Sequence, residues 1–406
     1  MAPHPTSRFP EGAAVTAADL EDDPHPHLAR LRAREPVSRL PALGGWLVTS
    51  RDLALRVMRD ASAFTVDDPR FSTAQVVGPS MLSLDGPAHA RHRDPFARPF
   101  RPAATRARFT AFTAAEAARL VGRLAPAGRA ELRGDLAGPL AVAVVTEALG
   151  LDGVDAATVR SWYAAFVAAV SAITAGGAAP PGTAEAYRLL GAAVEEAVAA
   201  SRPGALLTQV AGHGVAGHGS AGDGPSGALS TAEVVANTAV LMFGGIDTTE
   251  GMIANLVLHL LGNPAQLRLV LDDRSLLPAA IEESLRLEPS ASVVDRYATR
   301  DTDLGGAPVR AGDLVRVSIA GANRDPAVFP DPDRYDVRRH NAAEHLAFAH
   351  GPHFCFGAHL ARLEAAAALT ALLDGLPGLR LDPDRPARPR GLVFRRPERL
   401  DVRWDT

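Results

Sequence analysis

The sequence predicts a mainly α-helical protein with small β-rich parts near its two ends. Most of the chain is rich in alanine and leucine, and its apolar residues recur at the spacing of an amphipathic helix. Three short stretches instead alternate apolar and polar residues beside turn-forming residues, which is typical of strands. We expect one domain over 21–406, preceded by an N-terminal extension over 1–20.

The three strand-like stretches are separated widely along the chain. Residues 45–49 follow a proline and a glycine, and a helical pattern then runs from Arg51 to Arg59. Residues 313–319 and 400–404 alternate in the same way. We therefore expect one small sheet to involve the first part of the chain and another the last.

Helical spacing accounts for most of what lies between. The longest pattern begins after Ser230 or Thr231 as the cap, with Glu233 following. Glycine, histidine and proline in 203–229 predict a flexible connector. We read its histidines as solvated loop residues, because no acid or thiol is patterned around them. The expected helices are 104–124, 137–150, 156–173, 184–200, 231–262, 278–287 and 358–374.

Composition excludes several classes of protein. The chain has 406 residues, 47% hydrophobic, and a net charge of −4, which gives no general attraction to nucleic acid or anionic membranes. The chain contains 42 arginines and no lysine. The one cysteine permits neither an internal disulfide nor a multi-cysteine metal cluster. Without a signal-like start or about 18 uninterrupted apolar residues, we expect a cytoplasmic protein without a membrane span.

That single cysteine, Cys355, lies between Gly351 and Gly357 and directly before a helical pattern. The free N–H groups and the positive dipole end of the following helix can stabilise a thiolate. Three interpretations remain at this point: an inert packed cysteine, a nucleophile activated by His350 or His353, and a thiolate that binds a metal.

The second informative segment lies inside the longest helix. Gly244 and Gly245 each cost about 1 kcal/mol against alanine in a helix interior, so some other contribution should offset them. Close packing of a neighbouring helix is one explanation, and a groove beside a flat ligand is the other. Asp247 and Thr248 follow after Ile246, an acid and an alcohol suited to proton transfer.

The pattern Phe-x-x-Gly-x-His-x-Cys-x-Gly around Cys355 resembles the haem-binding signature of the cytochromes P450. The resemblance implies that Cys355 is the axial ligand of the haem iron and that His353 lies near a haem propionate. It also implies that Gly351 and Gly357 shape the loop against the haem and that Phe348 packs beside it.

The long helix resembles the oxygen-activating segment of the same family. By that resemblance Gly244 lies beside the haem, Thr248 hydrogen-bonds the bound oxygen and Asp247 relays protons from solvent. The implied fold is the cytochrome P450 fold: a helical bundle with a small β-rich lobe, and haem b between this helix and the cysteine loop. The chain departs from the family at Ala349, where glycine is usual, and at Phe356, where an aliphatic residue is commoner.

Two further resemblances concern the haem propionates and the loop before the cysteine. His89 and Arg93 lie four residues apart in a segment similar to the family's propionate-binding segment, and Arg296 matches a third propionate-binding position. Glu283 and Arg286 resemble the family's structural Glu-x-x-Arg pair. Its third member remains open among Arg334, Arg338 and Arg339.

Together these segments indicate a haem-dependent monooxygenase acting on a small organic molecule, and we expect a tailoring enzyme of bacterial secondary metabolism. Oxidative coupling, or a non-catalytic haem-binding sensor, are the alternatives. The resemblance implies a ferredoxin and a ferredoxin reductase as electron donors, and six arginines in 91–108 offer a landing surface. We expect a monomer. The implied pocket residues are Met81, Leu82, Val240, Val293, Val294 and Phe394.

Overall fold

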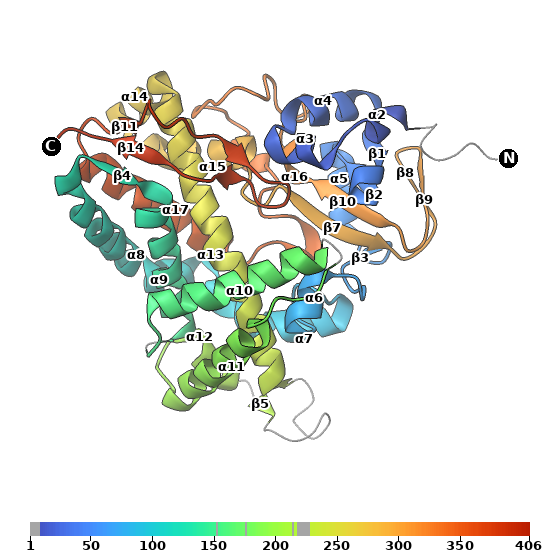
Figure 1. Ribbon diagram of the computed structural model, residues 1–406, viewed down its shortest axis with the longest axis horizontal. Helices are drawn as coiled ribbons and strands as arrows, with labels where there is room; N and C mark the ends of the chain where they lie inside the picture. Colours follow the sequence, from blue (N-terminus) through green and yellow to red (C-terminus); the bar gives the residue numbers. More distant parts are fainter. Residues whose placement is uncertain (1–8, 152, 175–176, 213–214, 217–227) are drawn as a thin grey trace.

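The computed structural model describes residues 9–406, except for 152, 175–176, 213–214 and 217–227. Helices make up most of the molecule, and the long helix α13 runs through its middle (Figure 1). The α-helices are α2 Pro10–Ala13, α3 Ala17–Asp22, α4 His25–Arg34, α5 Arg51–Arg59, α6 Ser72–Val77, α7 Gly86–Ala97, α8 Pro102–Leu124, α9 Gly138–Leu149, α10 Ala156–Thr174, α11 Thr183–Ala200, α12 Leu206–Gly212, α13 Thr231–Gly262, α14 Pro264–Asp272, α15 Leu277–Leu287, α16 Ile319–Ala322 and α17 Ala358–Gly375.

The largest sheet has five strands in the order β1-β2-β10-β7-β3, in which β2 and β10 are parallel and the other pairs antiparallel. It lies with α2 to α5 at one side of the molecule (Figure 1). A second sheet, β11-β14-β4, joins the C-terminus to the segment after α8. The strands are β1 Val37–Leu40, β2 Gly45–Val48, β3 Phe64–Thr65, β4 Arg129–Glu131, β5 Val215–Ala216, β6 Leu229–Ser230, β7 Val293–Ala298, β8 Thr302–Leu304, β9 Ala307–Val309, β10 Leu314–Ser318, β11 Arg380–Leu381, β12 Pro389–Arg390, β13 Arg396–Pro397 and β14 Asp401–Arg403.

The predicted helix 231–262 is confirmed as α13, and Ser230 is its cap. The Ser230 side chain accepts the Glu233 N–H, and the Glu233 carboxylate accepts the Ser230 N–H at 2.8 Å, which is a capping box. Helix α13 then packs on α9, α11, α15 and α17. The remaining expected helices and the three strand-like stretches are also present, with ends that differ by a few residues.

Two segments differ from the expectation. The range 203–229 contains helix α12, because Leu206, Leu207 and Val210 are buried in the main core; residues 213–214 and 217–227 lie outside the described part. Residues 9–20, expected as an extension, pack on the fold: the Phe9 ring meets Trp46 edge-on with centroids 5.0 Å apart. The apolar residues of 9–20 are too sparse to form a recognisable helical pattern.

Among the described helices, α10 alone is apolar enough, by length and composition, to cross a membrane. The sequence predicts no membrane span. It packs on α6, α9, α11 and α13, and its buried side chains are Val159, Trp162, Phe166 and Ala169. These contacts are those of a helix within a globular fold.

Candidate active site

The cysteine loop ends where α17 begins. The Cys355 N–H donates to the Phe348 carbonyl at 2.9 Å, which closes the loop, and Cys355 as a whole residue is exposed. Desolvation by the surrounding protein raises the pKa of the thiol, while N–H groups of Gly357 and Ala358 and the charge of Arg93 act in the opposite direction. The loop therefore places the sulfur at the N-terminus of a helix.

Two residues of this loop have left-handed backbone. Gly351 has φ +74°, and an added Cβ would lie 2.4 Å from the Met58 carbonyl oxygen on α5, so glycine is required there. Ala349 has φ +57°, a conformation that strains an alanine. The loop therefore needs a left-handed backbone at position 349, a conformation that glycine adopts without strain and that this chain adopts with alanine.

Four polar side chains from distant segments gather beside the loop. His353 Nε2 lies 2.9 Å from Asp85 Oδ1, and its ring centroid is 4.3 Å from that of His89 on α7. Arg296 on β7 is 5% exposed, and its charge reaches His353. Burial, followed by the positive charges of His353 and Arg93, lowers the pKa of His89 to about 4. Burial also lowers the pKa of Arg296.

The two glycines of α13 have separate explanations. An added Cβ at Gly245 would lie 2.7 Å from Val145 Cγ2 on α9, so this glycine allows two helices to pack closely. An added Cβ at Gly244 would meet no atom within 4 Å, and Gly244 is exposed. Only Gly244 therefore leaves open space of the kind that a flat ligand requires.

Asp247 and Thr248 occupy the next turn. Asp247 is 4% exposed and forms an ion pair with Arg396, with Nη1 to Oδ2 and Nη2 to Oδ1 both 2.6 Å. The Thr248 hydroxyl donates to the Gly244 carbonyl, as threonine often does inside a helix. Burial, with the charge of Asp247 next in importance, raises the pKa of the Tyr163 hydroxyl on α10.

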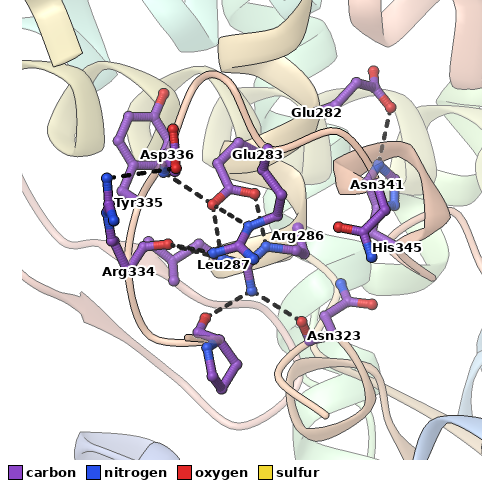
Figure 2. A network of polar contacts seen from close by, with 12 residues as sticks. Glu282, Glu283, Arg286, Leu287, Asn323, Arg334, Tyr335, Asp336, Asn341 and His345 are labelled. Carbon is purple, nitrogen blue, oxygen red and sulfur yellow. Dashed lines mark hydrogen bonds and ion pairs between the residues drawn. The ribbon is translucent and has the colours of Figure 1, made fainter. Parts of the chain in front are cut away.

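Helix α15 holds the predicted structural pair in a fully buried network. Arg286 Nε and Nη2 donate to the Glu283 carboxylate at 2.7 and 2.8 Å, and both residues are 0% exposed. Arg339 Nε donates to Glu283 at 3.0 Å, so Arg339 is the third member; Arg334 contributes only its carbonyl oxygen. Figure 2 shows Arg286 surrounded by these acceptors, including the carbonyl of Asn323.

Comparisons with known proteins decide the family. The family model described as Cytochrome P450 matches residues 215–376. The chain is 36% identical to "Cytochrome P450 monooxygenase PikC" of Streptomyces venezuelae over 90% of this chain and 86% of the relative. It is 35% identical to "Mycinamicin IV hydroxylase/epoxidase" of Micromonospora griseorubida, over 92% and 94%.

The chain is a cytochrome P450.

Solved P450 structures agree with this assignment. The crystal structure of P450BioI with an acyl carrier protein superposes with a TM-score of 0.83 at 27% identity, covering 95% of this chain and all of that one. CalO2 gives 0.82 at 30% identity, with 96% and 97% covered. The predicted P450 fold and monooxygenase class are confirmed, and the family implies a haem cofactor, an organic substrate and redox partner proteins.

The residues of this P450 fit a haem. His89 is 6% exposed, and its Nε2 has no hydrogen-bond partner among the described residues. A buried nitrogen of this kind requires a polar partner, and a propionate beside His89, His353 and Arg296 would supply one. Cys355 offers a free thiol, and Gly244 leaves space where a side chain would otherwise lie.

The structure does not group every residue of this P450 as expected. Arg93 donates to the Phe354 carbonyl and lies over the Phe356 ring, with its Cζ 5.2 Å from the ring centroid, so it also braces the cysteine loop. Val293 and Val294 lie on opposite faces of β7, because successive strand residues alternate. Val294 shares its face with Arg296, whereas Val293 lines a small cavity with Leu20, Leu47 and Leu392, among others.

The remaining pocket candidates fall into two groups. Met81 and Val240 are buried and Leu82 packs beside them in the main core. The Phe394 ring lies 5.5 Å from that of Phe243, which in turn lies 6.3 Å from Tyr163. This row joins the hairpin of β12 and β13 to α13 and α10, and sequence analysis singled out neither Phe243 nor Tyr163.

Two other residues belong to the site: Asp85 opens the segment that carries His89 and Arg93, whereas Arg396 carried no local signal. Asp85 accepts hydrogen bonds from Thr65 Oγ1 at 2.7 Å and the Val66 N–H at 2.9 Å as well as facing His353, so burial is outweighed and the pKa of Asp85 is lowered. Arg396 lies in an arginine-rich segment, and nothing near it in the sequence relates it to Asp247. Its partner is 149 residues away.

The arginines of 91–108 do not form one uniform surface. Arg91 pairs with Glu233 and donates to the Ala228 carbonyl at 3.0 Å, and Arg108 donates to the Glu147 carbonyl at 2.8 Å. These two, with Arg93, serve internal contacts. Arg101 and Arg106 are exposed and remain available to a partner protein.

Proposed function

We propose that this P450 binds haem b through Cys355 and inserts one oxygen atom from O2 into a small organic molecule. The observation that carries the proposal is the position of Cys355: a free thiol before α17, beside a buried cluster of His89, His353 and Arg296. The sulfur suits an iron atom, and the cluster suits the two carboxylates of the same ligand.

The haem, when bound, supplies O2 activation. In our proposal the chain's own contribution is proton delivery by Asp247 and Thr248, which lie on consecutive positions of α13. The Asp247 carboxylate takes a proton arriving from solvent, and the Thr248 hydroxyl, which now donates to the Gly244 carbonyl, turns to pass it on. Arg396 holds Asp247 in place and must let it move during this transfer.

Other assignments rest on the same logic. We assign to Glu283, Arg286 and Arg339 the role of fixing the segment before the cysteine loop. The Asn323 carbonyl accepts a hydrogen bond from Arg286, and the Asn323 side chain accepts the Leu346 N–H at 2.7 Å. We assign Gly351, Gly357 and Phe348 to shaping the loop. Gly357 lies close to the sulfur: an added Cβ would be 3.7 Å from Cys355 Sγ.

For the substrate, we infer a secondary metabolite modified late in its synthesis. The relatives support this, since they include the mycinamicin IV enzyme, "Nocardicin C N-oxygenase" and "20-oxo-5-O-mycaminosyltylactone 23-monooxygenase". We propose Val240, Phe243, Val294 and Phe394 as apolar walls of the substrate pocket: Val240 belongs to the main core, and the Phe243 and Phe394 rings lie 5.5 Å apart. Val293 lines the small cavity beside the N-terminal helices, so the proposed walls leave it out.

For its partners, we infer a ferredoxin and a ferredoxin reductase in the cytoplasm, and a monomeric enzyme. An acidic ferredoxin would meet the exposed Arg101 and Arg106. Exchanging both for glutamate should slow electron transfer from the ferredoxin and weaken its salt dependence, while leaving substrate binding unchanged.

The direct test reconstitutes the purified holoenzyme with a surrogate ferredoxin and reductase. Candidate substrates are first screened by the shift of the haem absorbance on binding, and the best binder is then turned over under isotopically labelled O2. One labelled oxygen atom in the product is the expected result. Thr248→Val, which keeps the shape but removes the hydroxyl, should consume O2 with little product. Unlabelled product, or equal yield from Thr248→Val, would contradict the proposal.

A further inference from the structure

Helix α15 carries two consecutive glutamates with different partners. Glu283 belongs to the buried network described above, whereas Glu282 points to the other side of the helix (Figure 2). The Glu282 carboxylate accepts two hydrogen bonds from Arg362, from Nε at 2.6 Å and Nη2 at 2.8 Å. His345 Nε2 lies 3.2 Å from Glu282 Oε2. The proposed function uses none of these three residues.

The two partners of Glu282 come from opposite sides of the cysteine. His345 precedes the loop, and Arg362 lies on the second turn of α17 after it. Both contact the same ring: the Arg362 guanidinium carbon is 4.5 Å from the Phe348 centroid, and the His345 and Phe348 centroids are 5.9 Å apart. The Phe348 carbonyl accepts the Cys355 N–H. The Glu282 carboxylate thus binds one residue from each side of the cysteine loop, and both of these residues contact the Phe348 ring.

Glu282 also balances a charge. Arg362 lies close to the cysteine loop: its Nη1 donates to the carbonyl of Ala358, three residues after Cys355, at 3.3 Å, and its guanidinium stacks on Phe348. The Glu282 side chain is 17% exposed and the Arg362 side chain 30%, so water screens this pair only in part. Burial alone would raise the pKa of Glu282, but the hydrogen bonds and charges of Arg362 and His345 lower it to about 2, so the carboxylate is ionised at neutral pH.

We propose that Glu282 is a positioning residue for the cysteine ligand: it holds Arg362 and His345 against Phe348 and offsets the charge that Arg362 projects onto Cys355. This inference rests on the proposed function, in which Cys355 binds the haem iron. Groups near the ligand adjust the electron affinity of a haem centre through charge and hydrogen bonding. Glu282 and Arg362 therefore set the reduction potential as a pair of opposite sign.

A tie between α15 and α17 with no effect on the haem is the competing explanation, and the sign of the potential shift distinguishes them. Reduction adds one electron to the haem–cysteine unit. Glu282→Gln removes a negative charge and leaves Arg362 uncompensated, so the potential should rise. Arg362→Gln leaves Glu282 uncompensated, so the potential should fall. The double variant should return toward the wild-type value.

Two further variants control the experiment. Glu344→Gln removes the same charge next to His345, but Glu344 is 55% exposed and faces Arg51 at 4.0 Å, so its shift should be smaller than that of Glu282→Gln. Arg362→Lys keeps the charge but loses the bidentate pair and the stacking over Phe348. Its potential should stay close to that of the wild type, while the red-shifted Soret band of its reduced carbon monoxide complex should decay faster during incubation.

The potentials are measured by spectroelectrochemistry on the substrate-free holoenzyme. Shifts of opposite sign in the two single variants, both larger than that of Glu344→Gln, support the inference. Shifts of the same sign, or shifts no larger than the control, overturn it, as does an Arg362→Lys potential that matches Arg362→Gln. If the wild type itself shows no red-shifted Soret band, the proposed function fails instead, so the two failures are distinguishable.

Discussion

Arg396 binds both carboxylate oxygens of Asp247, with each nitrogen–oxygen distance 2.6 Å. This ion pair joins β13, in the C-terminal hairpin, to the middle of α13. The same arginine lies 3.8 Å from the Glu250 carboxylate, one turn further along α13, and Glu250 is held in turn by Arg133. The acid that we assign to proton delivery is therefore anchored from outside its own helix.

This anchoring predicts how the two residues behave when altered. Asp247→Asn removes the proton relay, and product formation should fall by about 10²- to 10⁴-fold while the substrate-induced absorbance shift persists. Arg396→Gln leaves a buried carboxylate without its cation, which should lower the free energy of unfolding by about 3–5 kcal/mol. Turnover assays and urea unfolding at neutral pH measure the two effects.

The double variant provides the control for this pair. Asp247→Asn combined with Arg396→Gln leaves no uncompensated charge, so it should unfold at a higher urea concentration than Arg396→Gln alone. Arg390→Gln alters an arginine of the same hairpin that pairs with Asp22 at 3.0 Å, and it should leave turnover unchanged. A double variant that is less stable than Arg396→Gln would argue against the pairing.

The adjacent glycines of α13 should respond in opposite ways to alanine. Gly245→Ala places a methyl group 2.7 Å from Val145 Cγ2 and should cost about 1–3 kcal/mol in the free energy of unfolding, recovered when Val145→Ala is added. Gly244→Ala meets no atom within 4 Å and should stabilise the polypeptide by about 0.5–1 kcal/mol, but it should reduce haem occupancy or substrate binding. Equal effects of the two substitutions would contradict the assignment of Gly245 to helix packing and of Gly244 to ligand space.

Replacing Ala349 by glycine should stabilise the protein. Its left-handed backbone costs roughly 1–2 kcal/mol, of which glycine would recover a part after its own entropy loss of about 0.5–1 kcal/mol. We expect Ala349→Gly to raise the free energy of unfolding by about 0.5–1 kcal/mol without changing the haem spectrum. Thermal unfolding of the two holoenzymes side by side measures this, and a lower midpoint for the glycine variant would refute it.

His259 gives stability a defined pH dependence. Its Nδ1 lies 2.9 Å from Ser284 Oγ, which links α13 to α15, and burial lowers its pKa from 6.5 to about 4. Between those values the unfolded chain binds a proton that the folded chain does not, so stability rises with pH across this window. The shifted pKa of His259 raises the free energy of unfolding by about 3 kcal/mol between the lower and the upper end of this window. In His259→Gln the free energy of unfolding should rise less steeply between pH 4 and 6.5. An unchanged slope would mean that other groups cause the pH dependence.

The sequence was sufficient where local patterns carry the information. The start of α13 could be predicted because Ser230 and Glu233 form a capping box next to a long apolar run. The cysteine loop and the Glu283–Arg286 pair were recognisable because their spacing is local.

The sequence was insufficient where the answer depends on a distant segment. Gly244 and Gly245 look alike until Val145, about a hundred residues earlier, is seen to face only one of them. Arg339 could not be chosen over Arg334 and Arg338, because the path of the chain after Pro332 decides which guanidinium reaches Glu283. Val293 and Val294 are both apolar, and only the pairing of β7 with β10 assigns their faces.

The account depends most on a bond between the Cys355 sulfur and the haem iron. We predict that the purified holoenzyme, reduced under carbon monoxide, gives the red-shifted Soret band for which the cytochromes P450 are named, and that Cys355→Ser abolishes it. A wild-type protein without that band, or a serine variant that retains it, would contradict the central claim.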